Sequence, residues 1–239
     1  MTTSLPDIQH NLEDVRQRIR RAAASAGRDP DGIRLIAVSK YMTPAHIARA
    51  MAAGQHVFGE NTVQEALGKL PLIQDPQNEW HFIGHLQTNK ARHIAANFAW
   101  FHTLDSLKLA RMLDRHAGEA GKQLRTLIQV NISGDPDKFG LEPEAVAGFV
   151  ETFLDAGLGA ISLHGLMTIG RHGISESGRR REFAGLRELG DTCAARFGTA
   201  HFSELSMGMS DDYEIAVSEG ATMVRIGSAI FGPRPRQRA

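Results

Sequence analysis

The sequence has 239 residues, and its 27 Lys and Arg side chains are balanced by 27 Asp and Glu, so the formal net charge at pH 7 is +0. This balance, without a long basic stretch, argues against nucleic acid as the main partner. No apolar stretch is long enough to span a membrane, and the polar N-terminus lacks a signal-peptide core. A single cysteine, Cys193, excludes an internal disulfide. These features predict a cytoplasmic protein whose partners are neither membranes nor nucleic acids.

A helix is predicted at about residues 4–26. Ser4-Leu5-Pro6-Asp7 resembles a capping box, and Gly27 can end the helix. Apolar side chains fall on one helical face at Ile8, Leu12, Val15 and Ile19. Because this helix precedes the first predicted strand, we expect it to lie against the bottom or the side of the domain.

The first predicted strand, residues 33–39, is an almost continuous apolar run that ends directly before Lys40. Thr43-Pro44 then has the pattern of a helix start. Lys40 therefore stands at the carboxyl end of a parallel strand, where α/β proteins bind ligands. A lysine in low-dielectric surroundings can lose its proton and attack a carbonyl as a free amine. We predict that Lys40 forms a Schiff base with an aldehyde cofactor; the alternative is a lysine that extends into solvent.

Strands and helices alternate along the rest of the chain. The predicted strands span 33–39, 56–61, 80–83, 100–104, 126–131, 160–167, 201–205 and 222–226. The Gly- and Ser-rich segment 170–178 is predicted to be a mobile loop, and 179–197 a helix. This alternation predicts an α/β fold, a (β/α)₈ TIM-type barrel, with an open doubly wound sheet as the alternative. No linker interrupts the pattern, so we expect one domain over residues 1–239.

In such a barrel the carboxyl ends of the strands share one mouth. The predicted strand ends carry Lys40, Asn61, His85, Asp105, Asn131, Ser206, Arg225 and Gly227. Barrels commonly hold phosphate in the loops after strands seven and eight, and here those loops contain Ser206–Ser210 and Gly227-Ser228. Glycines let backbone N–H groups approach an anion, and serine hydroxyls add donors. We predict a phosphate site in these two loops; the alternative is that they are ordinary caps and turns.

A lysine and a phosphate cradle in one mouth are the two anchors that pyridoxal 5′-phosphate (PLP) requires. Arg225 lies on the last strand, two residues before Gly227. Because a guanidinium does not readily lose its proton, Arg225 would donate to an unprotonated pyridine nitrogen, which weakens the ring as an electron sink. The alternative for Arg225 is a structural ion pair.

Other site motifs are missing from the sequence. It has no GxxxxGK[ST] and no GxGxxG after a strand, which disfavours an NTPase or a dinucleotide enzyme, and it has no GxSxG elbow of a serine hydrolase. His81 and His85 are four residues apart around a strand end, but two histidines make a weak case for a metal. We therefore predict no metal site.

Five motifs resemble those of the pyridoxal phosphate homeostasis proteins: AVSK at 37–40, FGENTVQE at 58–65, WHFIGHLQTNK at 80–90, GLMTI at 165–169, and LSMGMSDD with AVSEGATMVRIGSAIFG within 205–232. The motifs are long, and the resemblance runs from the first helix through the last strand.

This resemblance implies a type III PLP fold, similar to the N-terminal domain of alanine racemase. It implies PLP linked to Lys40, with Asn61 near the cofactor and Arg225 facing the ring nitrogen. It places Ser206, Gly208, Ser210, Gly227 and Ser228 around the phosphate. Members of the family bind PLP, have no well-established turnover, are linked to vitamin B6 balance, and are usually described as monomers and sometimes as dimers.

The sequence departs from the family pattern close to Lys40. Members often have a second lysine two residues after the PLP lysine, where this chain has Met42, and Tyr41 replaces a smaller residue. A cofactor relay through that second lysine is therefore in doubt. Lys138 matches a loop lysine proposed to handle PLP in the family, and the loop at 170–178 also departs from the usual pattern.

Three functions fit the sequence. The first is a PLP carrier that buffers the aldehyde and delivers it to PLP-dependent apoenzymes. The second is a PLP-dependent amino-acid racemase, which needs acid/base groups on both faces of its substrate. Related racemases take the second base from a C-terminal domain, and because this chain ends just after the eighth strand, we expect the carrier. The third is a sugar-phosphate aldolase without PLP, in which Lys40 would react with the substrate.

Overall fold

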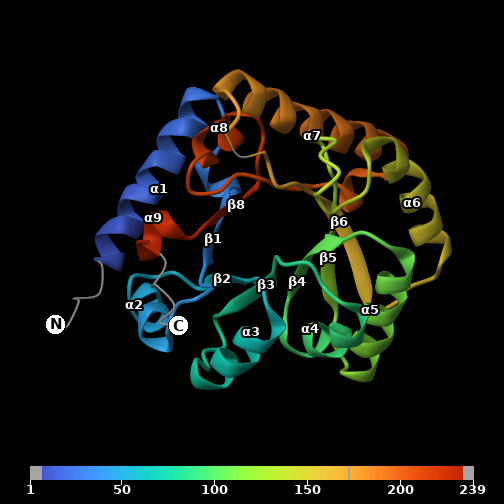
Figure 1. Cartoon of the computed structure of the whole chain (residues 1–239), viewed down its shortest axis with the longest axis horizontal. Coiled ribbons are helices and arrows are strands. Elements are labelled where there is room, and N and C mark those ends of the chain that lie inside the picture. Colours follow the sequence, from blue (N-terminus) through green and yellow to red (C-terminus); the bar gives the residue numbers. More distant parts are fainter. Residues whose placement is uncertain (1–6, 172, 234–239) are drawn as a thin grey trace.

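In the computed structural model, which describes residues 7–171 and 173–233, eight strands pair in parallel and close into a barrel (Figure 1). The strands are β1 (Arg34–Val38), β2 (Val57–Glu60), β3 (Glu79–Phe82), β4 (Trp100–Leu104), β5 (Leu124–Gln129), β6 (Ile161–Met167), β7 (Glu204–Ser206) and β8 (Met223–Ile226). Each strand pairs with the next, and β8 returns to β1 with Arg225 opposite Ile36. The predicted (β/α)₈ barrel is confirmed, and the open sheet is excluded.

Helices cover the outside of the barrel (Figure 1). They are α1 (Ile8–Ser25), α2 (Pro44–Ala52), α3 (Val63–Lys69), α4 (Ala91–Asn97), α5 (Leu107–Glu119), α6 (Pro143–Asp155), α7 (Glu176–Phe197), α8 (Tyr213–Ser218) and α9 (Ser228–Phe231). Short 3₁₀ turns occur at Pro30–Gly32, Leu70–Leu72, Thr88–Lys90 and Thr199–His201.

Asp7 is the N-cap residue of helix α1. The side chain of Asp7 accepts a hydrogen bond from the backbone N–H of His10, at 3.0 Å. Residues 4–6 of the predicted capping box lie outside the described residues. The apolar face of α1 packs against α2, α8 and α9, so the helix covers the side of the barrel and not its bottom (Figure 1).

Several element boundaries differ from the sequence prediction. Helix α7 begins at Glu176 and not at residue 179, because the Ser175 hydroxyl accepts the N–H of Gly178 and caps the helix three residues earlier. Helix α3 has Thr62 as its N-cap, and Asn61 directly before it lines the cavity at the barrel mouth. Strand β5 ends at Gln129, two residues before the predicted end.

Apolar side chains form two layers. A small cluster comprises Ile36, Trp100, Leu127, Met167 and Met223, contributed by strands β1, β4, β5, β6 and β8. A larger cluster packs the helices against the strands, and it includes Cys193 of α7. Cys193 is buried, and burial raises the pKa of its thiol.

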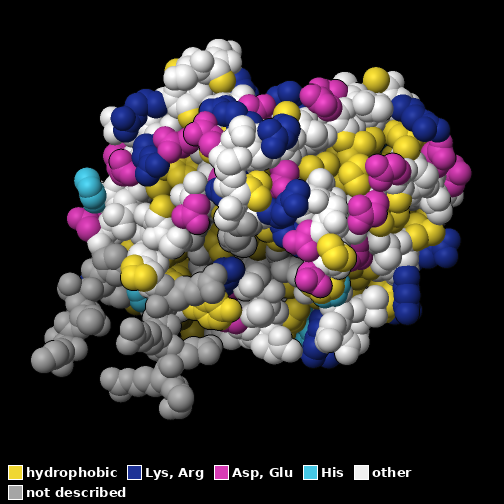
Figure 2. Space-filling model, turned by 45° about the horizontal axis from the view of Figure 1, so that its top comes forward, with side chains coloured by type: hydrophobic (Ala, Val, Ile, Leu, Met, Phe, Trp, Pro, Cys, Tyr) yellow, Lys and Arg dark blue, Asp and Glu magenta, His cyan; other side chains and the backbone are white. Residues whose placement is uncertain are grey.

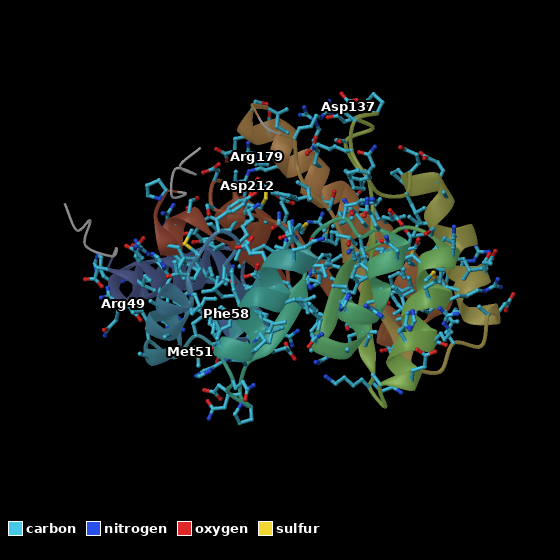
Figure 3. All side chains as sticks on the ribbon, turned by 60° about the horizontal axis from the view of Figure 1, so that its bottom comes forward. Arg49, Met51, Phe58, Asp137, Arg179 and Asp212 are labelled. Atoms are coloured by element: carbon cyan, nitrogen blue, oxygen red, sulfur yellow. The ribbon has the colours of Figure 1, made fainter. Side chains whose placement is uncertain are left out.

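The surface mixes charges of both signs, as expected from a net charge of +0 (Figure 2). One ion pair ties a helix to a loop at the barrel mouth, because Arg179 of α7 lies 3.1 Å from the carboxylate of the nearly buried Asp212 (Figure 3). The same carboxylate accepts the N–H of Met209, so the loop between β7 and α8 is held on two sides. Across residues 7–171 and 173–233, no helix combines the length and the apolar character that a membrane crossing needs.

Strand β6 can approach β7 closely only because residue 165 is a glycine. Its φ of +152° is rare for other residues, and a Cβ there would lie 1.9 Å from the carbonyl oxygen of Glu204. We expect Gly165→Ala to lower the free energy of unfolding by roughly 3 kcal/mol or more, as measured by urea denaturation.

Gly148→Ala is the matched control. Gly148 lies inside α6, and a Cβ added there would have no atom within 4 Å, so the new methyl group meets nothing. This change should stabilise the protein by about 0.5–1 kcal/mol through helix propensity. Equal effects of the two substitutions would contradict the close packing of β6 on β7.

Candidate functional site

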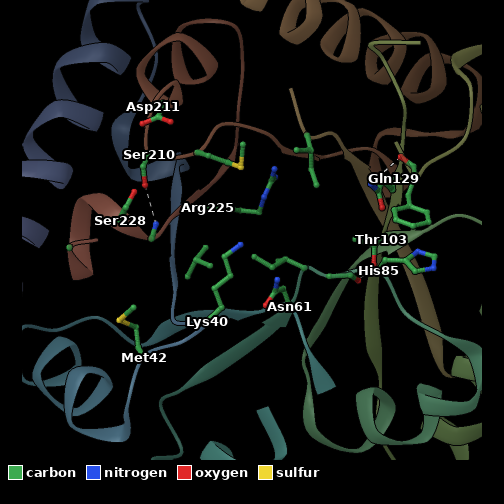
Figure 4. A pocket seen from close by; sticks show the side chains of 18 residues that line it. Lys40, Met42, Asn61, His85, Thr103, Gln129, Ser210, Asp211, Arg225 and Ser228 are labelled. Carbon is green, nitrogen blue, oxygen red and sulfur yellow. Dashed lines mark hydrogen bonds between the residues drawn. The ribbon is translucent and has the colours of Figure 1, made fainter. Parts of the chain in front are cut away.

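A cavity of about 430 Å³ opens at the carboxyl ends of the barrel strands (Figure 4). Six of the eight predicted site residues line it: Lys40, Asn61, Ser210, Arg225, Gly227 and Ser228. The side chain of Lys40 extends toward Arg225, Ser210 and Ser228 lie at one end of the cavity, and His85, Thr103 and Gln129 lie at the other (Figure 4). The mouth of the barrel therefore collects the polar groups that the strand ends supply.

Lys40 follows β1 in a tight turn. The N–H of Ser39 bonds to the carbonyl of Gly59, and the N–H of Met42 bonds back to the carbonyl of Ser39, both at 3.0 Å. Within the turn Tyr41 adopts a φ of +65°, a conformation that residues other than glycine rarely take. The N–H of Tyr41 donates to the carboxylate of Glu65, which holds this conformation.

A buried ionic cluster lies beneath this turn. The Nζ atom of Lys69 lies 2.7 Å from the carbonyl oxygen of Ser39, 2.9 Å from Glu60 Oε1 and 2.5 Å from Glu65 Oε1. Ser39 Oγ also donates to Glu60 Oε1, at 2.6 Å. Burial raises the pKa of the Glu60 carboxyl, and the Lys69 charge opposes that rise. Because Lys69 and Glu65 bind the backbone on either side of Lys40, the root of the Lys40 side chain is fixed.

Backbone N–H groups converge at the end of the cavity that holds Ser210. The N–H groups of Gly227 and Ala229 both lie 3.3 Å from Ser210 Oγ, which accepts from them (Figure 4). Two donors and a hydroxyl directed at one place can also receive the oxygens of an anion. Asp211 lines the same end, but its side chain is exposed, so water screens its charge.

Ser206 and Gly208, the other two predicted site residues, lie behind the cavity wall. The backbone carbonyl of Gly208 accepts the N–H of Arg225 at 3.0 Å. Gly208 has a φ of +92°, and a Cβ there would lie 2.6 Å from that of Ala216. The hydroxyl of Ser206, which is fully buried, accepts from Arg225 Nη1 at 2.7 Å. Both residues therefore hold Arg225.

Arg225 is almost completely buried, with 4% of its surface exposed. Its Nη1 donates to Ser206 Oγ, and its Nη2 donates to the carbonyl oxygen of Thr168 at 2.8 Å. Burial lowers the pKa of Arg225 to about 10, and the charge of Asp212 acts against this shift, so the guanidinium keeps its proton at pH 7. No carboxylate of the described residues pairs with it directly, which argues against the structural ion pair considered from the sequence.

Of the residues at the cavity end opposite Ser210, the sequence had indicated His85 but not Thr103 or Gln129. The ring of His85 stacks on that of Phe139, with ring centroids 3.8 Å apart, and Thr103 donates to the carbonyl of Gly84. Gln129 lines the cavity because β5 ends two residues early, whereas Asn131 bonds within the following loop. Gln129 could have been identified from the sequence, because it is a polar residue within an apolar stretch.

Two acceptors in the cavity lack partners. Asn61 Oδ1 and Gln129 Oε1 are buried and accept no hydrogen bond from the described residues. A buried polar atom without a partner is unfavourable, so both positions favour a ligand that brings donors.

The two histidines considered for a metal lie in different places. His81 is enclosed in the barrel interior, where it bonds to Glu79 and His102, whereas His85 reaches the cavity. Within the described part of the chain, no group of three or more His, Cys, Asp or Glu side chains has an arrangement suited to a metal ion.

Two further residues that the family resemblance brought into view lie at or near the cavity. The nearly buried Met42 lines it close to Lys40 and contributes an apolar thioether. Lys138 does not line the cavity, but its Nζ donates to the carbonyl of Ile169, a lining residue, at 3.2 Å.

The sequence from residue 4 to residue 235 matches the family described as the N-terminal domain of alanine racemase. The pyridoxal phosphate homeostasis protein of Pseudomonas aeruginosa is 44% identical over 227 residues, which cover 95% of this chain and 96% of that protein. The protein of the same name from Escherichia coli (strain K12) is 43% identical over 236 residues, covering 95% of this chain and 97% of that protein.

Solved structures agree with these relatives. PipY of Synechococcus elongatus with PLP bound is 38% identical, with a TM-score of 0.79 over 90% of this chain and 100% of PipY. The alanine racemase of Clostridium difficile is 14% identical, with a TM-score of 0.73, and the match covers 99% of this chain and 60% of the racemase. At that identity the likeness concerns the fold alone.

The ionic cluster beneath Lys40 gives a stability test. Lys69→Met removes the cation and leaves the Glu60 carboxylate buried without it, which should lower the free energy of unfolding at pH 7 by about 3–5 kcal/mol. Without the cation the folded-state pKa of Glu60 rises further above that of the unfolded chain. The loss should therefore shrink as the pH falls toward the ordinary value of 4.5, below which Glu60 is protonated in both states.

Two further variants complete this test, all measured by urea denaturation. Lys69→Met combined with Glu60→Gln should recover most of the loss, because an amide carries no charge to bury. Arg20→Met removes a surface pair with Glu13 and should leave stability almost unchanged. A loss in Lys69→Met that does not vary with pH would refute the ionic explanation.

Proposed function

Because the chain belongs to the pyridoxal phosphate homeostasis protein family, we propose that it binds PLP in the cavity at the barrel mouth and serves intracellular PLP (vitamin B6) homeostasis. One observation carries the proposal. A single cavity brings together the Lys40 amine, the converging N–H groups of Gly227 and Ala229, and the Arg225 guanidinium. These groups match the aldehyde, the phosphate and the ring nitrogen of PLP in chemical type.

The residues present fit the cofactor in further respects. The N–H groups of Gly227 and Ala229, which now donate to Ser210 Oγ, can donate to a phosphate instead. The hydroxyls of Ser210 and Ser228 can add hydrogen bonds to it. The partnerless Asn61 Oδ1 suits a donor on the ring substituents. The apolar walls that include Val38 and Ile83 suit the faces of an aromatic ring.

We propose that Lys40 holds the cofactor as a Schiff base. Lys40 would supply the amine for a C=N bond to the aldehyde carbon, with the aldehyde oxygen released as water. The buried cluster of Lys69, Glu60 and Glu65 supports this role, because it fixes the backbone from which the Lys40 side chain extends. A fixed attachment point lowers the entropy lost on forming the bond.

The nature of Arg225 bears on how strongly bound PLP would activate an amino acid. When bound, PLP supplies an electron sink, and a protonated ring nitrogen makes it strong. A guanidinium held by Ser206 and Thr168 donates a hydrogen bond and keeps its own proton, so the ring stays a weak sink. Such a site retains PLP without activating amino acids strongly.

The proposal extends to the fate of the cofactor. We propose that the protein acts as a monomer in the cytoplasm and passes PLP to PLP-dependent apoenzymes. Cys193 is a free, buried cysteine, which suits a reducing compartment. Large exposed apolar side chains within the described residues are few, which favours a monomer.

We expect the purified protein to show a long-wavelength absorption band with PLP that borohydride abolishes, and peptide mass mapping to locate the reduced cofactor on Lys40. Lys40→Ala should lose both signals, because no amine remains to form the C=N bond. Lys138→Ala is the matched control, since its amine bonds to the carbonyl of the lining residue Ile169, and it should keep the label on Lys40.

The alternatives predict other results. Labelling of Lys138 in the native protein would show that Lys40 is not the attachment site. Steady racemisation of an L-amino acid, abolished by Lys40→Ala, would support the racemase. Absence of any cofactor band after addition of PLP would leave the sugar-phosphate aldolase as the function to test.

A further inference from the structure

A row of hydrogen-bonded side chains crosses the barrel interior from its amino-terminal end to the cavity. Glu79 Oε1 lies 2.9 Å from His81 Nε2, and His81 Nδ1 lies 2.8 Å from His102 Nε2. His102 Nδ1 lies 2.9 Å from Ser206 Oγ, which accepts from Arg225 Nη1 at 2.7 Å. We call these five side chains the interior row.

The interior row is enclosed. His81, His102 and Ser206 have no exposed surface, and they come from three different strands, β3, β4 and β7. Only the two ends approach solvent, Glu79 at the start of β3 and Arg225 at the cavity. Barrel interiors are usually filled by apolar side chains, and buried polar groups persist where every one of them has a partner.

The bonding pattern fixes the position of each hydrogen. A carboxylate only accepts, so Glu79 takes the hydrogen on His81 Nε2, and the Nδ1 atom of a neutral His81 must then accept from His102 Nε2. His102 Nδ1 in turn accepts the hydroxyl hydrogen of Ser206, which leaves the Ser206 oxygen to accept from Arg225. In the reverse direction, the hydroxyl hydrogen of Ser206 would have no acceptor among its partners in the described chain.

The surrounding charges agree with neutral imidazoles. Burial lowers the pKa of His81 to about 4, although the Glu79 carboxylate acts against this shift, and burial lowers the pKa of His102 well below its usual value. Arg34 and Arg125 lie near Glu79 at the amino-terminal end of the barrel and also oppose a charge on His81. The row therefore joins a carboxylate at one end to a guanidinium at the other through two neutral rings.

We propose that the interior row is a positioning device for Arg225, in which His102 and Ser206 set the orientation of the guanidinium that faces the cofactor ring. The identity of the ligand rests on the proposed function, whereas the hydrogen-bond direction does not depend on it. Because a hydrogen-bonded chain polarises its members, the orientation of Arg225 is linked to the Glu79 cluster on the far side of the barrel.

The first test uses the protein without added cofactor. Nitrogen-15 NMR at neutral pH should show His81 and His102 as neutral rings that each carry their hydrogen on Nε2. A charged His102, or a hydrogen on its Nδ1, would overturn the proposal, whatever the protein binds. This readout needs no substitution, so it is not affected by a variant that fails to fold.

The second test compares variants loaded with PLP. Ser206→Ala and His102→Leu should each weaken PLP affinity by roughly tenfold and shift the absorption band of the bound cofactor, because Arg225 loses its fixed orientation. His102→Asn should restore part of the native band, because its amide oxygen can accept from Ser206 where Nδ1 did.

Thr126→Val is the matched control, because it removes a buried hydroxyl that bonds to the carbonyl of Ser162, outside the interior row. It should leave the band and the affinity unchanged. A native band and native affinity in Ser206→Ala would overturn the positioning role while the proposed function stands. Absence of PLP binding to the native protein would instead refute the proposed function and leave the NMR result to judge the hydrogen-bond direction.

Discussion

The pairing of β1 with β8 is the contact on which the rest of the structure depends. It sets Arg225 opposite Ile36 and brings the turn that carries Lys40 next to the loop that begins at Gly227. In an open sheet these two strands could lie at opposite edges, and the lysine and the converging N–H groups would not share a cavity. Closure also removes both sheet edges, along which unpaired N–H groups would otherwise be exposed.

Closing the barrel confines polar groups to an interior that excludes water. In the structure these groups form two separate hydrogen-bonded systems. One is the cluster of Lys69, Glu60 and Glu65 beneath the end of β1, and the other is the interior row through the centre of the barrel. Burying these groups is unfavourable unless they are bonded, and nearly every one has a partner. Within the two systems, Glu60 Oε2 lacks a partner among the described residues. Two other buried acceptors without a partner, Asn61 Oδ1 and Gln129 Oε1, lie at the cavity, where a ligand can supply donors.

The two systems act on different parts of the candidate site. One fixes the backbone beside Lys40, and the other holds the guanidinium of Arg225, so these two residues are supported by separate networks. A cofactor bound between them would be retained at both its aldehyde and its ring. Retention with a weakly activated ring suits a protein that stores and delivers PLP.

The sequence by itself determined the alternation of strands and helices that favours a barrel, the strand-end position of Lys40 and the two loops near Ser210 and Gly227. These features follow from local signals, such as continuous apolar runs, glycines and caps, which act within a few residues. Only the tertiary structure decided that Ser206 turns away from the cavity, that Gln129 faces it, and that two histidines from neighbouring strands bond to each other. Those outcomes depend on the register between strands, because a shift of one residue reverses which side chains point inward. Register is set by the closure of the whole barrel, and no single segment contains it.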